Sequence, residues 1–154
     1  MLEENFIAAD FGAGSGRVIL GTLFNNKIKL TEVHRFENKI IETDTHIFWD
    51  LDYLFNELLN GLKKVAELGK KNILGIGIDT WGVDYALLND NNELLNNPYV
   101  YRDSRTNGIM DEVFKIIPKK KIYEQTGIQF LQFNTIYQLF AELKDENSNL
   151  KRQM

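Results

Sequence analysis

The chain has 154 residues, of which 44% are hydrophobic and 26% are charged, as expected of one ordinary globular domain. Its net charge of −4 at pH 7 argues against a nucleic acid or an anionic membrane as the partner, because such surfaces bind a clustered basic field. The absence of cysteine excludes disulfide bonds and thiolate metal sites. No apolar run reaches the roughly 20 residues that cross a bilayer, and the acidic first five residues lack the pattern of a signal peptide. We therefore expect a cytoplasmic protein without a nucleic-acid or membrane partner.

The first forty residues predict β structure. Apolar residues have the spacing of strands in three stretches, at residues 6–9, 17–24 and 27–36. Asn25 and Asn26 separate the last two stretches and tolerate the positive φ angles of a tight hairpin turn. In the third stretch the apolar positions change face after Glu32, so the strand pattern is interrupted there. Three successive strands joined by short turns predict an antiparallel meander.

Helices dominate the remainder of the chain. Asp50 suits an N-cap and Gly69 a position after a helix end, so a helix is predicted over residues 51–68. Apolar runs at residues 73–78 and 83–88 predict two further buried strands, of which the first is central in the sheet. Three more helices are predicted at residues 106–117, 119–126 and 135–144. The polar stretch 145–154 is either a tail or the start of a truncated remainder.

This order of elements matches the ribonuclease-H-like sheet of the actin and hexokinase type. It contains a three-strand meander, a crossover helix and then a further strand. We therefore expect an α/β fold with a mixed sheet flanked by helices, in one domain that comprises residues 1–144.

The turn between the first two strands carries the first group of chemically capable residues, in the run Asp10-Phe11-Gly12-Ala13-Gly14-Ser15-Gly16-Arg17. Glycines let backbone N–H groups approach an anion without a Cβ in the way. A carboxylate such as that of Asp10 can hold Mg²⁺ through water, and Arg17 adds a permanent charge for phosphate oxygens. These are the parts of a nucleotide-phosphate site. A hairpin turn with a surface salt bridge would have the same sequence.

Three further segments combine polar and aromatic residues. In the run 77–85, Trp81 and Gly82 offer an apolar wall and a bare backbone to a sugar, or else form a turn around a core tryptophan. In the run 99–106, two arginines around an aspartate favour an ion-pair knot over a ligand cleft. The run 126–135 mixes amides with aromatic rings, which suits a carbohydrate or an ordinary buried loop. His34 and His46 have no neighbours at metal-ligand spacing, so we interpret them as structural.

Taken together, these segments resemble one known family. Residues 10–17 resemble the N-terminal phosphate loop of the FGGY carbohydrate kinases. Within that family, residues 78–85, 101–106, 122–123, 126–130 and 134–135 resemble the rhamnulokinase group, in matching order and spacing along residues 6–139. One departure is visible, because the family loop more often has a serine where this chain has Gly14.

The resemblance implies ATP-dependent phosphorylation of L-rhamnulose on its 1-hydroxyl, with ATP and Mg²⁺ as cofactors. It places Asp10 near Mg²⁺. It assigns five residues to the ATP phosphates, namely Ala13, Gly14, Ser15, Gly16 and Arg17. It assigns Gly82 to the sugar, and we add Trp81, Tyr101 and Phe133 as further candidates for the sugar-side wall.

The resemblance also implies a missing part. The family has a second domain that supplies the adenine pocket and the aspartate that deprotonates the attacking hydroxyl, so no catalytic base is predicted within these residues. We expect the 154 residues alone to be inactive and capable of self-association, with the C-terminal domain of the same chain as their natural partner.

Three alternatives stay open at this stage. The first is a ribonuclease-H-like nuclease, in which Asp10, Asp79 and Asp84 gather two metal ions. The second is a non-catalytic nucleotide-binding module of the same fold. The third is a kinase for another ketose or deoxy-sugar.

Overall fold

The computed structural model describes residues 3–146, 148 and 150. The chain forms two compact units that exchange segments along the sequence. We call them the sheet unit, made of residues 1–39 and 50–82, and the helical unit, made of residues 40–49 and 83–154. None of the helices in the described part of the chain is long and apolar enough to cross a membrane.

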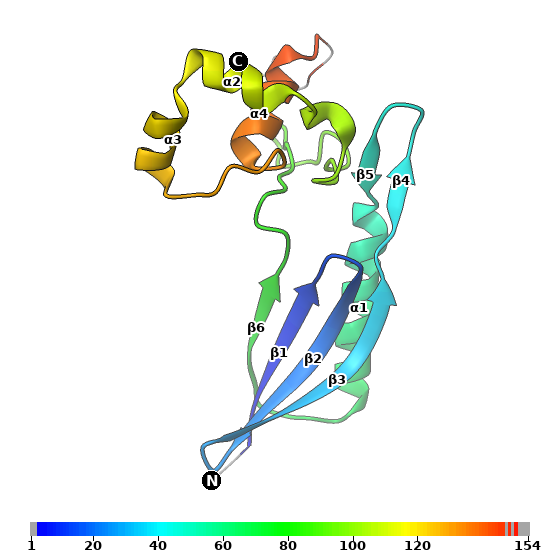
Figure 1. Cartoon of the computed structure of the whole chain (residues 1–154). Coiled ribbons are helices and arrows are strands. Elements are labelled where there is room, and N and C mark those ends of the chain that lie inside the picture. Colours follow the sequence, from blue (N-terminus) through cyan, green and yellow to red (C-terminus); the bar gives the residue numbers. More distant parts are fainter. Residues whose placement is uncertain (1–2, 147, 149, 151–154) are drawn as a thin grey trace. The chain divides into compact units, whose positions relative to one another are not determined.

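A four-stranded mixed sheet forms the sheet unit (Figure 1). Its strands are β1 (Glu4–Phe11), β2 (Ser15–Phe24), β3 (Lys27–Glu37) and β6 (Ile73–Asp79), in the order β3-β2-β1-β6. The first three strands pair antiparallel, as the predicted meander requires, and β6 pairs parallel to β1. Asn25 and Asn26 have φ angles of 48° and 58° in the turn between β2 and β3, which confirms the predicted hairpin.

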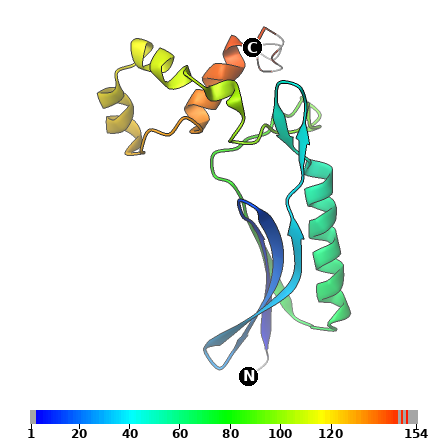
Figure 2. The ribbon, with the colours of Figure 1, turned by 45° about the vertical axis from the view of Figure 1, so that its right-hand side comes forward.

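One helix, α1 (Leu51–Glu67), covers one face of this sheet (Figure 2). Asp50 caps it, since its carboxylate accepts a hydrogen bond from the Tyr53 N–H. The shared core lies between Leu58 and Val65 of α1 and four buried residues of the sheet: Ile7, Ala9, Val18 and Leu20. Along the chain, α1 lies between β3 and β6, two strands that run in the same direction. This crossover helix confirms the ribonuclease-H-like class.

The position of β6 corrects one expectation. The apolar run of residues 73–78 was predicted to be a central buried strand, but β6 lies at an edge of the sheet. Leu74, Ile76 and Ile78 are 54%, 55% and 61% exposed, because α1 packs on β2 and β3 instead. The apolar sequence of β6 is typical of a strand that other elements cover, but no other described residues bury these side chains.

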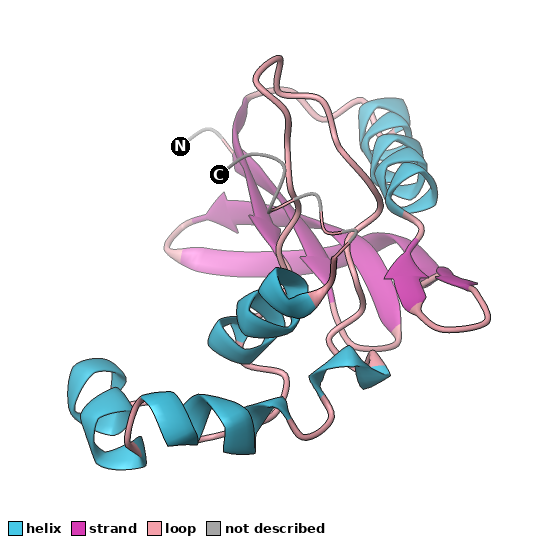
Figure 3. Ribbon diagram, turned by 90° about the horizontal axis from the view of Figure 1, so that it is seen from above, coloured by secondary structure: helices cyan, strands magenta, loops and turns pink. Residues whose placement is uncertain are grey.

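The helical unit contains the predicted helices, in part with different limits (Figure 3). Helices α3 (Lys119–Thr126) and α4 (Thr135–Lys144) have the predicted bounds. The predicted helix 106–117 is shorter in the structure, where α2 comprises Ile109–Ile116, and Thr106 ends a preceding 3₁₀ turn, η1 (Ser104–Thr106). Gly108, with φ of 75°, lies in the left-handed region and separates the two, because a right-handed helix cannot pass through that conformation.

Two β features of the helical unit differ from the prediction. A hairpin of β4 (Ile40–Glu42) and β5 (Ile47–Trp49) was not predicted, because three-residue strands leave almost no alternating pattern. The predicted strand 83–88 is absent from the described residues, and this segment makes a single bridge between Leu88 and Leu94. The Val83 carbonyl accepts from side chains of α4 instead of a neighbouring strand.

An apolar cluster holds the helices of this unit together. It is built from Ile109, Val113, Ile122 and Tyr137, with Phe114, Phe130 and Phe140 packed around them. Phe114 contacts Phe130 and Tyr137 edge-on, which is the geometry that aromatic rings prefer in a core. This cluster positions the run 126–135, whose aromatic residues were interpreted as a sugar wall or a buried loop.

Candidate functional site

The glycine-rich turn between β1 and β2 is open to solvent. The Gly12 N–H donates to the Ser15 carbonyl at 3.1 Å and closes the hairpin. Ala13 and Gly14 at its tip are exposed. Backbone donors at an exposed turn are available to an anion, so the turn is not sealed by other side chains.

Charged residues from neighbouring strands form a row next to this turn. Asp10 lies opposite Arg17 in the β1–β2 ladder, and the Arg17 Nε is 2.9 Å from the Asp10 carboxylate. Asp79 is the neighbour of Asp10 on β6, and Arg35 is the neighbour of Arg17 on β3. Residues directly opposed in a ladder point to the same face, which here is the face opposite α1. The surface salt bridge of the alternative interpretation therefore exists, and its two side chains remain 35% exposed.

Packing requires a glycine at one position of the turn, Gly16, but not at Gly14. A Cβ on Gly16 would lie 2.2 Å from the ring of Phe36, a buried side chain, so packing below the turn requires a glycine at this position. A Cβ on Gly14 would meet nothing within 4 Å. The serine that the family more often has at this position would therefore fit, and its replacement by glycine leaves the backbone of the turn intact.

Trp81 lies against the turn. Its indole N–H donates to the Gly12 carbonyl at 3.1 Å, and its ring is 6.3 Å from that of Phe11. Gly82, the next residue, is exposed, and a Cβ there would meet nothing within 4 Å. The structure thus brings Trp81 and Gly82 together with the predicted phosphate loop.

Asn38 also belongs to this site, and our sequence interpretation missed it. Its side-chain N–H donates to the Gly12 carbonyl at 2.8 Å, and its backbone N–H donates to the Gly14 carbonyl at 3.2 Å. An asparagine after a strand is the usual signature of a turn. Its sequence position therefore gave no signal of a contact with a loop more than twenty residues away.

The remaining predicted sugar-side residues, Tyr101 and Phe133, contact each other within the helical unit. Their ring centroids are 5.6 Å apart and their planes meet at 67°. The guanidinium of Arg102 lies over the Tyr101 ring at 5.0 Å. Both rings are partly accessible, as a wall for the C–H surface of a sugar would need to be.

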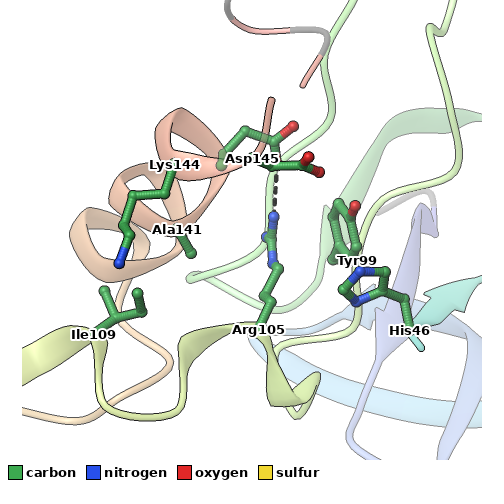
Figure 4. A pocket seen from close by; sticks show the side chains of 8 residues that line it. His46, Tyr99, Arg105, Ile109, Ala141, Lys144 and Asp145 are labelled. Carbon is green, nitrogen blue, oxygen red and sulfur yellow. Dashed lines mark hydrogen bonds and ion pairs between the residues drawn. The ribbon is translucent and has the colours of Figure 1, made fainter. Parts of the chain in front are cut away.

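The predicted ion-pair knot of the run 99–106 exists with different partners. Arg105 pairs with Glu142 of α4 at 2.6 Å, and both side chains are only 8% exposed. Arg105 also donates to Gln138 at 2.8 Å and stacks on the Tyr99 ring, with 3.7 Å between the guanidinium carbon and the ring centroid. Figure 4 shows Arg105 between the end of α4 and Tyr99.

The Asp103 side chain belongs to the same cluster and binds backbone N–H groups. Its carboxylate accepts from the N–H groups of Ile47 and Arg105 and lies 3.2 Å from the His46 ring. His46 is therefore held by Asp103, and its observed contacts are those of a structural residue. His34 contacts Glu57 and Lys64 of α1 in a similar way.

A cavity of about 310 Å³ opens beside the knot and is lined by residues such as His46, Tyr99 and Glu142. Burial raises the pKa of Tyr85, whose hydroxyl bonds Glu142, to about 12. Burial also raises the pKa of Tyr99. Both phenols therefore remain neutral at physiological pH.

Asp84 is engaged within the helical unit. Its carboxylate accepts from the Trp49 indole N–H at 2.7 Å. Across the described residues, no three carboxylate, histidine or cysteine side chains form a group that could hold a metal ion.

The chain belongs to the FGGY family of carbohydrate kinases, because its residues 6–154 match the model of that family's N-terminal domain. Its curated relatives include the rhamnulokinases of Mannheimia succiniciproducens, 51% identical over 93% of this chain, and Oceanobacillus iheyensis, 49% identical over 97%. The rhamnulokinase of Bacillus subtilis is 45% identical over 89% of this chain. The chain spans only 30% and 31% of the length of the first two relatives.

Solved structures support the same fold. A gluconate kinase from Lactobacillus acidophilus matches 97% of this chain with a TM-score of 0.79 at 19% identity. A xylulose kinase from the same organism matches 93% with a TM-score of 0.77 at 18% identity. At these identities the likeness establishes the fold, and the chain covers about 30% of each neighbour.

Proposed function

We propose that this chain is the N-terminal domain of an ATP-dependent kinase that phosphorylates L-rhamnulose on its 1-hydroxyl in rhamnose catabolism. The observation that carries the proposal is the exposed, glycine-rich β1–β2 turn, flanked by Asp10 and Arg17, in a chain whose curated relatives are rhamnulokinases. Such a turn offers backbone donors and a permanent positive charge to phosphate oxygens. As a protein of this kind it would act in the cytoplasm.

The phosphate side of the site would use residues 13–17. The Ala13 and Gly14 tip is exposed, and Arg17 adds its guanidinium. Because Arg17 already contacts Asp10, phosphate would share the guanidinium with that carboxylate or draw it away. When no nucleotide is bound, the ion pair with Asp10 keeps Arg17 in place.

The Mg²⁺ ion that accompanies ATP fits Asp10 through water. A single carboxylate that is 35% exposed at a strand end suits an ion held mainly by nucleotide phosphates and water, and does not suit a closed protein cage. When bound, the ion would neutralise charge on the phosphates. Asp10 would orient one side of its hydration shell.

The sugar would contact Gly82, with Trp81, Tyr101 and Phe133 as wall residues. Gly82 presents open backbone, and the Tyr101–Phe133 pair presents aromatic surface. The Trp81 indole N–H is engaged with Gly12, so only its ring would serve the sugar.

The second domain of the longer relatives would supply the adenine pocket and the catalytic base. Phosphoryl transfer needs both substrates held in line, which one wall of a cleft cannot do. We therefore expect no turnover from these 154 residues alone. A non-catalytic nucleotide-binding module, or a kinase for another ketose or deoxy-sugar, is the alternative.

The decisive experiment compares ketoses as substrates of the full-length protein with ATP and Mg²⁺. We expect the highest kcat/KM for L-rhamnulose, and an Arg17→Gln variant to lose at least about tenfold, as for a removed charged contact of about 1.4 kcal/mol. Lys29→Gln, an exposed charge change on β3, is the matched control and should retain full activity. A higher kcat/KM for a different ketose would refute the assigned sugar, and no turnover of any sugar would refute the kinase.

A further inference from the structure

The Gly12 carbonyl accepts two side-chain hydrogen bonds from distant parts of the sheet unit. Asn38, which follows β3, donates through its amide at 2.8 Å. Trp81, which follows β6, donates through its indole N–H at 3.1 Å. A carbonyl in an exposed turn would ordinarily be satisfied by water, so two protein donors on one oxygen fix that oxygen in direction.

Because the peptide bond is planar, a fixed Gly12 carbonyl also fixes the direction of the Ala13 N–H. None of the peptide bonds in the described chain is cis, so the Gly12 C=O and the Ala13 N–H point in opposite directions. Because the donors of Asn38 and Trp81 hold the carbonyl inward, the Ala13 N–H points outward. Ala13 itself is exposed at the tip of the turn.

Asn38 fixes the turn at a second point. Its backbone N–H donates to the Gly14 carbonyl at 3.2 Å, so one residue holds both peptides that flank the Ala13–Gly14 tip. Glycine-rich peptides rotate easily between orientations. Without these contacts the Gly12–Ala13 peptide would sample states in which its N–H points inward.

We propose that Asn38 and Trp81 are positioning residues that hold the Gly12–Ala13 peptide with its N–H outward, ready for a phosphate oxygen of the nucleotide. This proposal rests on the proposed kinase function and adds a role for two residues that do not themselves touch the phosphates. Donors arranged before binding increase affinity because the turn loses less freedom when the ligand arrives.

The test measures ATP affinity and steady-state kinetics of the full-length protein with Asn38→Ala and Trp81→Phe. The phenylalanine keeps an aromatic ring towards Phe11 and removes the indole N–H together with the second ring of the indole. Each variant should weaken ATP binding and raise the KM for ATP about threefold to tenfold, as for one lost hydrogen bond. For Asn38→Ala the KM for the sugar should stay unchanged, which a general loss of structure would not produce. Trp81→Phe is judged by its ATP affinity and its KM for ATP, because the Trp81 ring is also a proposed part of the sugar-side wall.

Thr22→Val is the matched control. It removes a hydrogen bond from Thr22 to Asn5 in the same sheet, between residues that lie outside the turn. It should lower the urea midpoint without changing the KM for ATP. If Asn38→Ala does not fold, Trp81→Phe alone decides the outcome.

Two results would overturn the proposal and have different meanings. If the unmodified protein binds ATP and both variants bind it equally well, the positioning role is wrong and the kinase function stands. If the unmodified protein does not bind ATP, the proposed function fails and the positioning role fails with it.

Discussion

Arg105 shows how one buried charge organises the helical unit. The residue joins the loop before α2 to α4 by pairing with Glu142, and Tyr99 covers its guanidinium. A buried pair of this kind costs much desolvation, so its value depends on both partners being present. Glu142 also accepts from Tyr85 and Ser148, which completes its hydrogen bonding.

We predict that Arg105→Ala destabilises the chain by about 3–5 kcal/mol, because it leaves the Glu142 carboxylate buried and uncompensated. Urea unfolding at neutral pH measures this. The double variant Arg105→Met with Glu142→Gln removes both charges and keeps an acceptor for Tyr85, so it should be more stable than Arg105→Ala. Equal losses in the two proteins would show that the ion pair is not what stabilises this region.

Asp84 gives a prediction for pH. Burial raises its pKa above the ordinary value of 3.8, partly opposed by hydrogen bonds from Trp49 and Gln138. A raised pKa means that the folded state binds the proton more tightly than the unfolded state does. The stability contribution of Asp84 is therefore present below pH 3.8 and is lost as the pH rises through its folded pKa.

Asp84→Asn removes this titration and keeps an oxygen for the Trp49 N–H. We expect the free energy of unfolding of the unmodified chain, relative to that of the variant, to fall as the pH is raised from below 3.8 to neutral. Denaturant unfolding at several pH values measures the difference. A difference that rises with pH would mean that the Asp84 carboxylate is stabilised as an anion.

At the scale of elements, the contact of α1 with the sheet depends on a glycine in the middle of the helix. Gly61 is buried, and a Cβ there would lie 2.3 Å from a methyl group of Val18, which is fully buried. A mid-helix glycine is otherwise less favourable than alanine by about 0.5–1 kcal/mol. The close approach of α1 to β2 therefore outweighs helix propensity here.

We predict that Gly61→Ala destabilises the chain by about 1–3 kcal/mol, because overpacking exceeds the gain in propensity. Thermal or urea unfolding measures the change. Adding Val18→Ala should recover part of the loss, since it removes the methyl groups that the new Cβ meets. Asn60→Ala, on the exposed side of the helix, is the control for propensity, and a stabilised Gly61→Ala would contradict the packing explanation.

The elements also show where sequence patterns succeed. The meander, α1, α3 and α4 were predictable because each has several turns or alternations and a clear end, such as Asp50 or Gly127. The hairpin of β4 and β5 was not, because its strands are too short to alternate. Residues 83–88 resemble a strand in composition, but in the structure the Val83 carbonyl bonds side chains of α4 and not a neighbouring strand.

At the scale of the whole molecule, β6 is an open edge with apolar side chains. No charged residue occurs between Ile73 and Ile78, whereas protected edges often carry charged side chains. The longer relatives have about three times as much chain, which could provide the missing cover. Without that cover, the edge can pair with another copy.

We predict that the 154-residue chain self-associates and that Ile76→Lys shifts it towards monomer, because a lysine on an edge strand opposes pairing. Light scattering after size exclusion, over a series of concentrations, measures this. Ile116→Lys, a similar change at the exposed end of α2, is the control and should leave association unchanged. A chain that is monomeric at every concentration would refute the prediction.

Some features of the candidate site were predictable from the sequence, and others depend on the tertiary structure. The sequence by itself determined the glycine-rich turn between a carboxylate and an arginine, because these residues are local to one hairpin that any fold of this order would present. It also determined the class of fold, since hydrophobic periodicity records which face each element buries. Only the tertiary structure decided that Asn38 and Trp81 meet at Gly12, that Arg105 pairs with Glu142, and that β6 lies at an edge. These contacts join residues far apart in the chain, and their geometry follows from packing, which no local pattern encodes.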